Sequence, residues 1–360
     1  RPAGRPDDAL TRLDLAGLER HPCRNGPLEA RMLTGRIEGG PGSGPVDAAA
    51  LEHAAMFANR VRKNAQRLGR RARRKGIEAY RLYDRDLPEY AFIVDRYGDA
   101  LSVQELRPPA TVDPVMAARR RDAALAVLAD AAGVDEDAIH FRERRRQRPE
   151  EQYGVRDRRA EERIVAEEGA RFRVNLSDYL DTGLYPDSRG VRRHLREGFD
   201  EGGGGRFLNL FAYTGAATVQ AGLGGADESV SVDLSRTYLD WMLRQFELNG
   251  LDPAVHRRIR SDVLEWLTGP GRDEEPFDRI LLDPPTFSNS ARTEHDLDIQ
   301  RDHPRLLDAA LALLAPEGEL VLVVHARRFR LHWTPPPGFQ CDEITRRTLD
   351  EDCARGHPAH

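Results

Sequence analysis

The sequence predicts an α/β fold with a mostly parallel, doubly wound sheet, preceded by a small α+β domain. Two observations lead to this prediction. From residue 207 onward, short apolar segments alternate with helical ones, which is typical of parallel strands joined by right-handed crossovers. In addition, the apolar run 279–282 ends in the segment Asp-Pro-Pro-Thr-Phe (283–287). The two prolines fix the backbone and remove two N–H donors, so the chain leaves the sheet there as a stiff loop.

The composition excludes several classes of protein. The chain has 360 residues, of which 39% are hydrophobic and 32% charged, as expected for two or so domains with ordinary cores. No apolar run approaches the roughly 20 residues of a membrane helix. The three cysteines (Cys23, Cys341, Cys353) form no CxxC pair and have no histidine at ligand spacing, so we expect no metal site and a reducing cytosol. The net charge of −5 does not itself indicate a nucleic-acid partner.

The first 46 residues are expected to be the remnant of an upstream domain and a linker. The chain starts at Arg1 with neither an initiator methionine nor a signal peptide, so we expect a piece of a longer protein. Residues 28–33 have the composition of a strand without a partner in this chain, and we assign them to a sheet upstream. The glycine, proline and serine run at 39–45 is a flexible linker by composition.

Residues 47–76 predict a basic amphipathic helix, because apolar residues recur every three or four positions and Gly76 suits the residue after its end. No acidic residue lies between Arg60 and Lys75. This density of positive charge attracts phosphates, whereas a merely solvated basic face usually contains acids as well. We therefore predict RNA contact here and in a second basic loop. The candidates are Arg60, Arg62, Lys63, Arg67, Arg70, Arg71, Arg73, Arg74, Lys75, Arg144, Arg145 and Arg146.

Residues 77–174 predict a small α+β RNA-binding domain in the order strand, strand, helix, strand, strand. A helix over 115–131 begins after Asp113 and Pro114, which suit its N-cap and first position, and it stops at Gly133. The strands are expected at 80–83, 91–95, 101–104 and 139–144, with a hairpin at 164–174.

Residues 175–360 predict the doubly wound domain. The glycine run 202–205 precedes its first strand, and we interpret it as a hinge or linker. Ser235 suits the N-cap of one helix. The strands are expected at 207–211, 229–232, 255–259, 277–282 and 319–324, and the helices at 216–222, 236–248 and 299–314.

Three strand ends carry residues that suit a nucleoside cofactor, which binds beyond the carboxyl ends of strands in such sheets. Gly215 lies in a tight loop after the first strand. Asp233 follows roughly twenty residues later, the spacing of an acid that binds a ribose diol, and Asp262 follows the third strand. A dinucleotide enzyme would show GxGxxG after the first strand. The single glycine favours S-adenosylmethionine, although each acid alone is equally typical of a helix cap.

Five segments resemble the family of bifunctional ribosomal RNA large subunit methyltransferases K/L. The resemblance runs from about residue 56 to about residue 355, and residues 24–29 are similar to the last strand of the L half. It implies a Rossmann-like fold and methyl transfer from S-adenosylmethionine to N7 of a guanine in 23S rRNA. It also implies an L half, missing here, that methylates N2 of another guanine. The segments are 57–64 (FANRVRKN), 80–84 (YRLYD), 178–184 (DYLDTGL), 209–215 (NLFAYTG) and 283–290 (DPPTFSNS).

The resemblance also implies site residues, position by position. Asp187 and Arg189 match a motif that lines the cofactor pocket, and Asp233 with Leu234 matches the ribose site. Asp262 and Val263 match the adenine-side loop. The first cofactor loop is matched by Asn209, Phe211, Tyr213, Thr214 and Gly215. The substrate loop is matched by Asp283, Pro284, Pro285 and Phe287, and Asp283 also borders the cofactor.

The N7 atom of guanine is a free lone pair, so its methylation releases no proton and needs no general base. Alignment and exclusion of water can supply most of the catalysis. We expect Asp283 to orient the guanine through its N–H edge and to offset the positive charge that develops on the ring. We expect Phe287 to stack on an unpaired base, worth roughly 1–3 kcal/mol.

Two alternatives stay open. A C5-pyrimidine methyltransferase needs a thiolate, and no cysteine follows Asp283 or the last predicted strand at a suitable place. An RNA-binding assembly factor with a non-catalytic fold would bind the cofactor without transferring the methyl group. The chain also departs from the family at residues 185–189, at His325-Ala326, where relatives tend to have asparagines, and at its end, where we expect strand seven to be missing.

Overall fold

The computed structural model describes residues 15–25, 28–37, 48–106, 112–143, 162–177, 181–288, 296–326 and 328–354. Two units emerge from the contacts within the chain: Arg1–Ala58 with Pro108–Leu128, and Asn59–Arg107 with Ala129–His360. The expected linker at 39–45 lies outside the described residues. Among the described helices, none has both the length and the apolar character of a membrane span.

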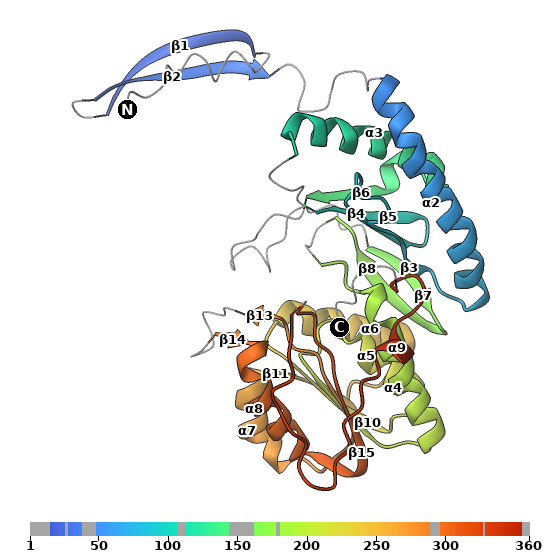
Figure 1. Cartoon of the computed structure of the whole chain (residues 1–360). Coiled ribbons are helices and arrows are strands. Elements are labelled where there is room, and N and C mark those ends of the chain that lie inside the picture. Colours follow the sequence, from blue (N-terminus) through green and yellow to red (C-terminus); the bar gives the residue numbers. More distant parts are fainter. Residues whose placement is uncertain are drawn as a thin grey trace. The chain divides into compact units, whose positions relative to one another are not determined.

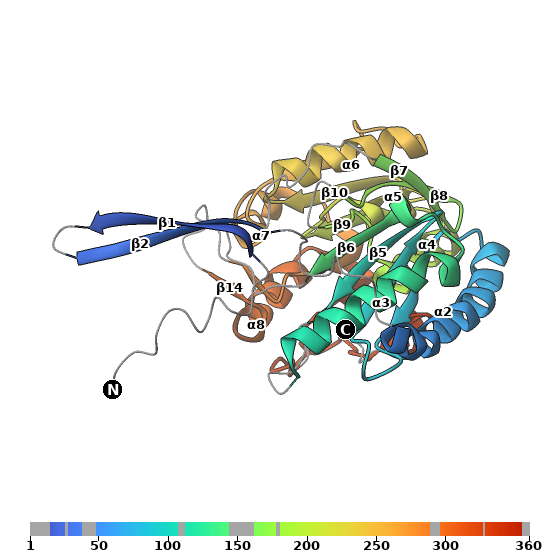
Figure 2. The ribbon, with the colours of Figure 1, turned by 90° about the horizontal axis from the view of Figure 1, so that it is seen from above.

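The first unit contains a long antiparallel hairpin of strands β1 (Leu15–Asn25) and β2 (Leu28–Ile37) (Figure 2). The expectation that residues 28–33 form a strand without a partner in this chain is therefore wrong. The partner strand escaped prediction because it contains Pro22, which lacks the N–H of a ladder donor. A strand in a two-stranded sheet is an edge strand, where a proline is tolerated.

Helix α2 (Ala48–Arg74) follows the expected range closely. It ends where Gly76 adopts a left-handed backbone with φ of 63°, as its position after the helix predicts. Asn64 lies on the buried side of α2 and donates from Nδ2 to the carbonyl oxygen of Leu82, at 3.0 Å. Val61, Leu68 and Ala72 are buried along the same helix. The basic residues therefore occupy the remaining faces.

The second unit contains a four-stranded sheet in the order β3-β4-β5-β6. Its strands are β3 (Ala79–Asp84), β4 (Phe92–Tyr97), β5 (Ala100–Glu105) and β6 (Ile139–Glu143). The three strands expected at 80–83, 91–95 and 101–104 all precede helix α3 (Pro114–Ala132), so the sheet has one strand more before the helix than the expected order strand, strand, helix, strand, strand gives. The first three pair antiparallel, and β6 runs parallel to β5, which requires a crossover between them. The Asp113 carboxylate accepts the Val115 N–H at 2.8 Å, which confirms the predicted N-cap of α3.

The hairpin of β7 (Glu162–Glu167) and β8 (Ala170–Asn175) forms a sheet of its own. It packs on helix α6 (Arg236–Asn249), where the Trp241 indole N–H donates to the Arg173 carbonyl oxygen at 3.1 Å. Phe172 and Phe246 are fully buried in the same core. The hairpin is thereby attached to the parallel-sheet domain, and it also contacts the chain just before β3, where the Glu78 N–H donates to the Ala166 carbonyl oxygen at 2.8 Å.

A five-stranded parallel sheet forms the centre of the second unit, in the order β11-β10-β9-β12-β15. Alternate residues of its strands face opposite sides, as the period of two requires. Leu208, Val230 and Ile280 pack against helices α7 and α8, whereas Phe207 and Leu281 pack against α4 and α5. Helices thus cover both faces, as a doubly wound fold predicts (Figure 1). The strands are β9 (Arg206–Leu210), β10 (Glu228–Asp233), β11 (His256–Arg260), β12 (Phe277–Leu282) and β15 (Leu314–Leu322).

Helices α4 (Arg189–Gly202) and α7 (Val263–Thr268) were not predicted. Helix α4 is difficult to predict because only Val191, Leu195 and Phe199 mark its buried side among many charged residues. Helix α8 (Ile299–Leu311) ends earlier than expected, and β15 begins earlier, at Leu314. The other elements are helices α5 (Ala216–Leu223) and α9 (Thr345–Thr348), strands β13 (Phe287–Ser288) and β14 (Leu297–Asp298), and the short 3-10 helices Glu136–Ala138, Pro186–Ser188 and Pro270–Asp273.

The glycine run 202–205 is a helix end and a tight turn, so its interpretation as a hinge or linker is wrong. Gly203 caps α4 with φ of 73°. A Cβ atom on Gly204 would lie 2.5 Å from the Asp227 carboxylate, and the Gly205 N–H donates to that carboxylate at 2.8 Å. The glycines are required because the backbone passes close to an acidic side chain, which holds the turn in place.

Candidate active site

The candidate site lies where the sheet changes its direction of winding. From β9 the chain moves outward to β10 and β11, and then returns to the other side of β9 with β12 and β15. Ligands of open parallel sheets bind beyond the strand ends at such a switch point. The Asp283 N–H donates to the Leu210 carbonyl oxygen at 3.3 Å, and the Ala212 N–H to that of Val232 at 3.1 Å. The loops after β9, β10 and β12 therefore start side by side.

The loop after β9 has an unusual backbone. Phe211, Tyr213 and Gly215 all adopt positive φ angles, of 59°, 50° and 78°. Left-handed non-glycine residues cost free energy and persist where the surroundings hold them. Here the Tyr213 N–H donates to the Asp233 carboxylate at 2.8 Å, and the Thr214 hydroxyl donates to the Gly183 carbonyl oxygen at 2.6 Å. A Cβ atom on Gly215 would lie 2.3 Å from the Met242 side chain, so this position requires glycine.

Asp233 ends strand β10 and faces this loop. Its Oδ1 accepts the Ser235 N–H and its Oδ2 the Tyr213 N–H, both at 2.8 Å. Burial raises the pKa of Asp233 to about 6, although these two hydrogen bonds oppose the shift. Each carboxylate oxygen accepts one backbone N–H and retains a lone pair. Asp233 therefore has the acceptors that two ribose hydroxyl groups require.

Asp283 and His325 meet beyond the ends of β12 and β15. The His325 Nε2 atom lies 2.9 Å from Oδ1 of Asp283. Pro284, directly after Asp283, is buried, while the Phe287 side chain is 53% exposed. A carboxylate is thus held on a rigid segment beside an exposed aromatic ring, an arrangement suited to positioning a flat polar substrate.

A protein-family model described as S-adenosylmethionine-dependent methyltransferase matches residues 86–331. The chain belongs to this family. It is 46% identical over 365 residues to a ribosomal RNA large subunit methyltransferase K/L from Chromohalobacter salexigens, covering 97% of this chain and 49% of that protein. A protein of the same name from Pseudomonas paraeruginosa is 45% identical, over 90% of this chain and 44% of its own length. The chain therefore spans about half the length of these relatives.

The solved structure of SMU.776 in complex with SAH is also similar, with a TM-score of 0.63 and 27% sequence identity. The match covers 76% of this chain and 68% of that one. The strand-end residues of this methyltransferase fit S-adenosylmethionine, its family's cofactor, since Asp233 offers acceptors for the ribose and no pyrophosphate has to be held. The cofactor prediction is confirmed at the level of the family.

Asn209 and Asp262, two predicted cofactor residues of the methyltransferase, make other contacts. Asn209 is buried, and its Nδ2 donates to the Thr218 hydroxyl at 2.9 Å, so its amide group connects β9 to α5. The Asp262 carboxylate caps α7 by accepting the N–H groups of Leu264 and Glu265 at 2.9 and 3.0 Å. Asp262 still lies at a strand end, just after β11, whereas the Asn209 amide is used inside the fold.

Arg189 is buried, and its guanidinium is occupied by protein groups. Nε donates to Asp350 and Nη1 to the Ala79 carbonyl oxygen, both at 2.8 Å, and Nη2 donates to Asp352 at 2.5 Å. Although burial alone would lower it, Asp352 and Asp350 raise the pKa of Arg189. The neighbouring Asp187 lies 3.9 Å from the Arg81 guanidinium. The structure therefore gives Arg189 a role in joining the α4 end to the C-terminal segment.

Tyr213, a predicted cofactor residue, belongs to an aromatic cluster beside the β9 loop whose other members, Tyr185 and Tyr238, were not predicted as site residues. The Tyr185 and Tyr213 rings stack with centroids 5.5 Å apart, and the Tyr238 ring meets that of Tyr213 edge-on at 4.6 Å. The hydroxyl groups of Tyr185 and Tyr238 both donate to the Asp181 carboxylate. His325 was noted only as a departure from the family. For Tyr185 the available signal was its place directly after the segment 178–184, which resembles the family; Tyr238 and His325 lie far from the five segments and had no such signal.

The predicted RNA-binding cations of α2 differ in their surroundings. Several pair with carboxylates, as Arg62 does with Asp130 at 2.6 Å, and others are exposed. The second basic group, Arg144, Arg145 and Arg146, lies outside the described residues. Within the described ranges, no three His, Cys, Asp or Glu side chains gather as metal ligands would.

Proposed function

We propose that this protein transfers a methyl group from S-adenosylmethionine to N7 of a guanine in 23S ribosomal RNA. The observation that carries the proposal is the pair of Asp283, on the rigid segment after β12, and His325, after β15, with the exposed Phe287 four residues beyond Asp283. Two relatives that are 45–46% identical to this chain over the aligned region are named ribosomal RNA large subunit methyltransferases K/L. The names of these relatives support an RNA substrate. The chemistry of the site supports N7 of guanine as the methylated atom, because N7 needs no general base.

The cofactor is assigned to the loops after strands β9, β10 and β11 of the parallel sheet. Asp233 accepts the ribose hydroxyl groups, and the backbone of residues 211–215 surrounds the methionine part. The Asp262-Val263 segment borders the adenine. When bound, the cofactor supplies a methyl group on a positively charged sulfur atom. Asp233 and Gly183 hold the 211–215 loop, so contacts within the protein fix the shape of this surface.

The substrate guanine is assigned to Asp283 and Phe287. One Asp283 oxygen accepts the His325 N–H, and the other accepts an N–H of the guanine edge. The carboxylate then offsets the positive charge that the ring acquires when N7 is methylated. N7 carries no hydrogen, so the site needs no general base. A C5-pyrimidine reaction would need a thiolate, and the sequence has no cysteine between Asp283 and Gln340.

The chain spans about half of the K/L relatives, so a second activity is proposed for the remainder of a longer protein. We assign guanine N2 methylation to that L half, as the resemblance implies. The rRNA, or its assembly precursor, is the proposed partner of the basic side of α2. The L half is the second proposed partner.

The test uses purified protein, labelled S-adenosylmethionine and 23S rRNA from a strain that lacks the enzyme. Borohydride and aniline treatment then cleaves the RNA at N7-methylguanine. Label incorporation with one new cleavage site is expected, and Asp283→Asn, which has nearly the same size, should lose it. Label without cleavage would mean methylation of another atom. Cofactor binding without label would instead favour a non-catalytic assembly role or a requirement for the L half.

A further inference from the structure

Most of the predicted RNA-binding cations in and just after helix α2 fall into two groups; Lys63, which is exposed and does not line the cavity described below, belongs to neither. Three of them pair with carboxylates of neighbouring elements: Arg60 with Asp86 at 3.8 Å, Arg62 with Asp130 at 2.6 Å, and Lys75 with Glu168 at 4.0 Å. Arg67 and Arg71 both contact the single carboxylate of Glu351. These cations are partly neutralised, and they attach the helix to the rest of its unit.

Arg70, Arg73 and Arg74 form the second group. All three side chains are exposed, and none of the carboxylates in the described ranges forms an ion pair with them. Together with Arg67 they line a cavity of about 620 Å³. Arg70 donates from Nε to the carbonyl oxygen of Gln66 at 3.0 Å, in the preceding turn. This contact orients its guanidinium while leaving the terminal nitrogens as donors.

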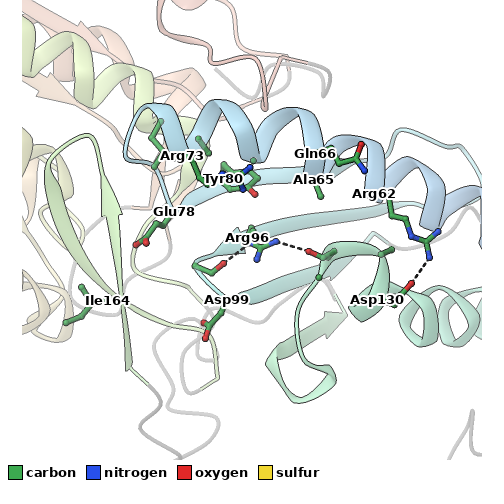
Figure 3. A pocket seen from close by; sticks show the side chains of 17 residues that line it. Arg62, Ala65, Gln66, Arg73, Glu78, Tyr80, Arg96, Asp99, Asp130 and Ile164 are labelled. Atoms are coloured by element: carbon green, nitrogen blue, oxygen red, sulfur yellow. Dashed lines mark hydrogen bonds and ion pairs between the residues drawn. The ribbon is translucent and has the colours of Figure 1, made fainter.

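Arg73 also lines a second hollow of about 800 Å³ (Figure 3). In this hollow Arg62 is drawn toward Asp130, and Arg96 donates to the carbonyl oxygens of Gly98 and Ala132 at 2.7 and 2.8 Å. A Cβ atom on Gly69 would lie 3.3 Å from the Tyr80 hydroxyl and 3.6 Å from Arg73 Nη1. Glycine inside a helix is unfavourable, and here it leaves room for Tyr80 and Arg73 between the two hollows.

We propose that Arg70, Arg73 and Arg74 are the RNA phosphate-binding site of this helix, whereas Arg60, Arg62 and Lys75 serve the fold. The inference rests on the proposed function for the identity of the ligand as RNA. A guanidinium group binds phosphate through two parallel hydrogen bonds, which an exposed arginine can supply without breaking an existing pair. Each phosphate neutralised by such a cation releases counterions, so binding through this group depends steeply on salt.

The experiment measures the Kd of a single-stranded 23S rRNA fragment as a function of potassium chloride concentration. The variant R70Q/R73Q/R74Q removes three charges from the proposed site. The matched control R60Q/R62Q/K75Q removes three charges from the same basic segment, at positions that pair with carboxylates. A single-strand phosphate contact contributes about 0.7 to the slope of log Kd against log salt, so the first variant should lower it by about 2. The control should change it much less.

The proposal would be overturned if R70Q/R73Q/R74Q and R60Q/R62Q/K75Q gave equal slopes of log Kd against log salt. It would also be overturned if R70Q/R73Q/R74Q did not lower the slope. R70K/R73K/R74K keeps the charges and should restore most of the slope, which separates loss of charge from loss of structure. Calorimetric S-adenosylmethionine binding reports whether each variant is folded. If the wild-type protein binds RNA with the expected slope but methylates nothing, the proposed function fails and this site stands. If the protein methylates the RNA but R70Q/R73Q/R74Q leaves the slope of log Kd against log salt unchanged, the proposed function stands and this phosphate-binding site fails.

Discussion

The Nε2 atom of His325 lies 2.9 Å from Oδ1 of Asp283, which connects the segments that follow strands β15 and β12. The carboxylate accepts this hydrogen bond, so the histidine orients the side chain that is proposed to hold the guanine. His325 acts through Asp283 and is therefore a positioning residue.

His325→Ala is expected to lower the methyl-transfer rate about 10- to 100-fold, since a hydrogen bond to a charged group contributes about 1.5–3 kcal/mol. The cofactor Kd should not change. His325→Asn keeps an N–H donor and should recover part of the rate. Single-turnover methylation of 23S rRNA measures the step directly. A rate for His325→Ala equal to that of the wild type would show that the pair has no part in the reaction.

The raised pKa of Asp233 predicts a pH-dependent affinity for the cofactor. Burial moves this pKa from 3.8 to about 6. The ribose hydroxyl groups donate to the ionised form, so the Kd for S-adenosylmethionine should rise as the pH falls below about 6, approaching tenfold per pH unit. Calorimetry between pH 5 and pH 8 checks this, with Asp233→Asn as the variant that should bind weakly at every pH.

The same shift has the opposite effect on the stability of the cofactor-free protein. A carboxyl group whose pKa is raised by folding stabilises the fold while it is protonated in both states. Its contribution is therefore complete below pH 3.8 and is lost as the pH rises to about 6.

Cofactor affinity that is constant from pH 5 to pH 8 would remove Asp233 from the ribose site.

Substitution of Arg189 tests whether this residue has a structural role or the cofactor-binding role that the resemblance implies. Its guanidinium is buried and contacts Asp350, Asp352 and the Ala79 carbonyl oxygen. Arg189→Ala removes one partner each from Asp350, which keeps Arg193, and from Asp352, which keeps the Arg81 N–H, so the free energy of unfolding should fall by up to about 3–5 kcal/mol. Chemical denaturation measures this loss. If stability is instead unchanged while the cofactor Kd rises, the assignment from the resemblance is correct.

The sheet could be predicted because its strands are short apolar runs bounded by turn residues, and β12 matches the expected range 277–282. The strand-end positions of Asp233, Asp262 and Asp283 followed from the same pattern. The contacts of Arg189 could not be predicted, because its partners Asp350 and Asp352 lie about 160 residues later in the sequence. The contact of Asn209 with Thr218 could not be predicted either, because it depends on how α5 packs on β9.

Phe287 provides the most direct test of the proposed substrate loop. Its ring is 53% exposed, and only Thr286 separates it from the rigid Asp-Pro-Pro segment. An exposed aromatic ring offers a surface for stacking of a base. Loss of one stacked base costs about 1–3 kcal/mol, so Phe287→Ala should raise the KM for rRNA by roughly 5- to 150-fold. The cofactor Kd should stay the same.

The control variants of Phe287 distinguish stacking from general apolar contact. Phe287→Trp keeps an aromatic face and should retain a KM close to that of the wild type. Phe287→Leu keeps apolar surface without a π face and should resemble the alanine variant. Because an exposed side chain adds little to the core, all three variants should unfold at similar denaturant concentrations. A leucine variant as active as the tryptophan variant would mean that the ring does not stack on a base, and the substrate would then be held by Asp283 alone.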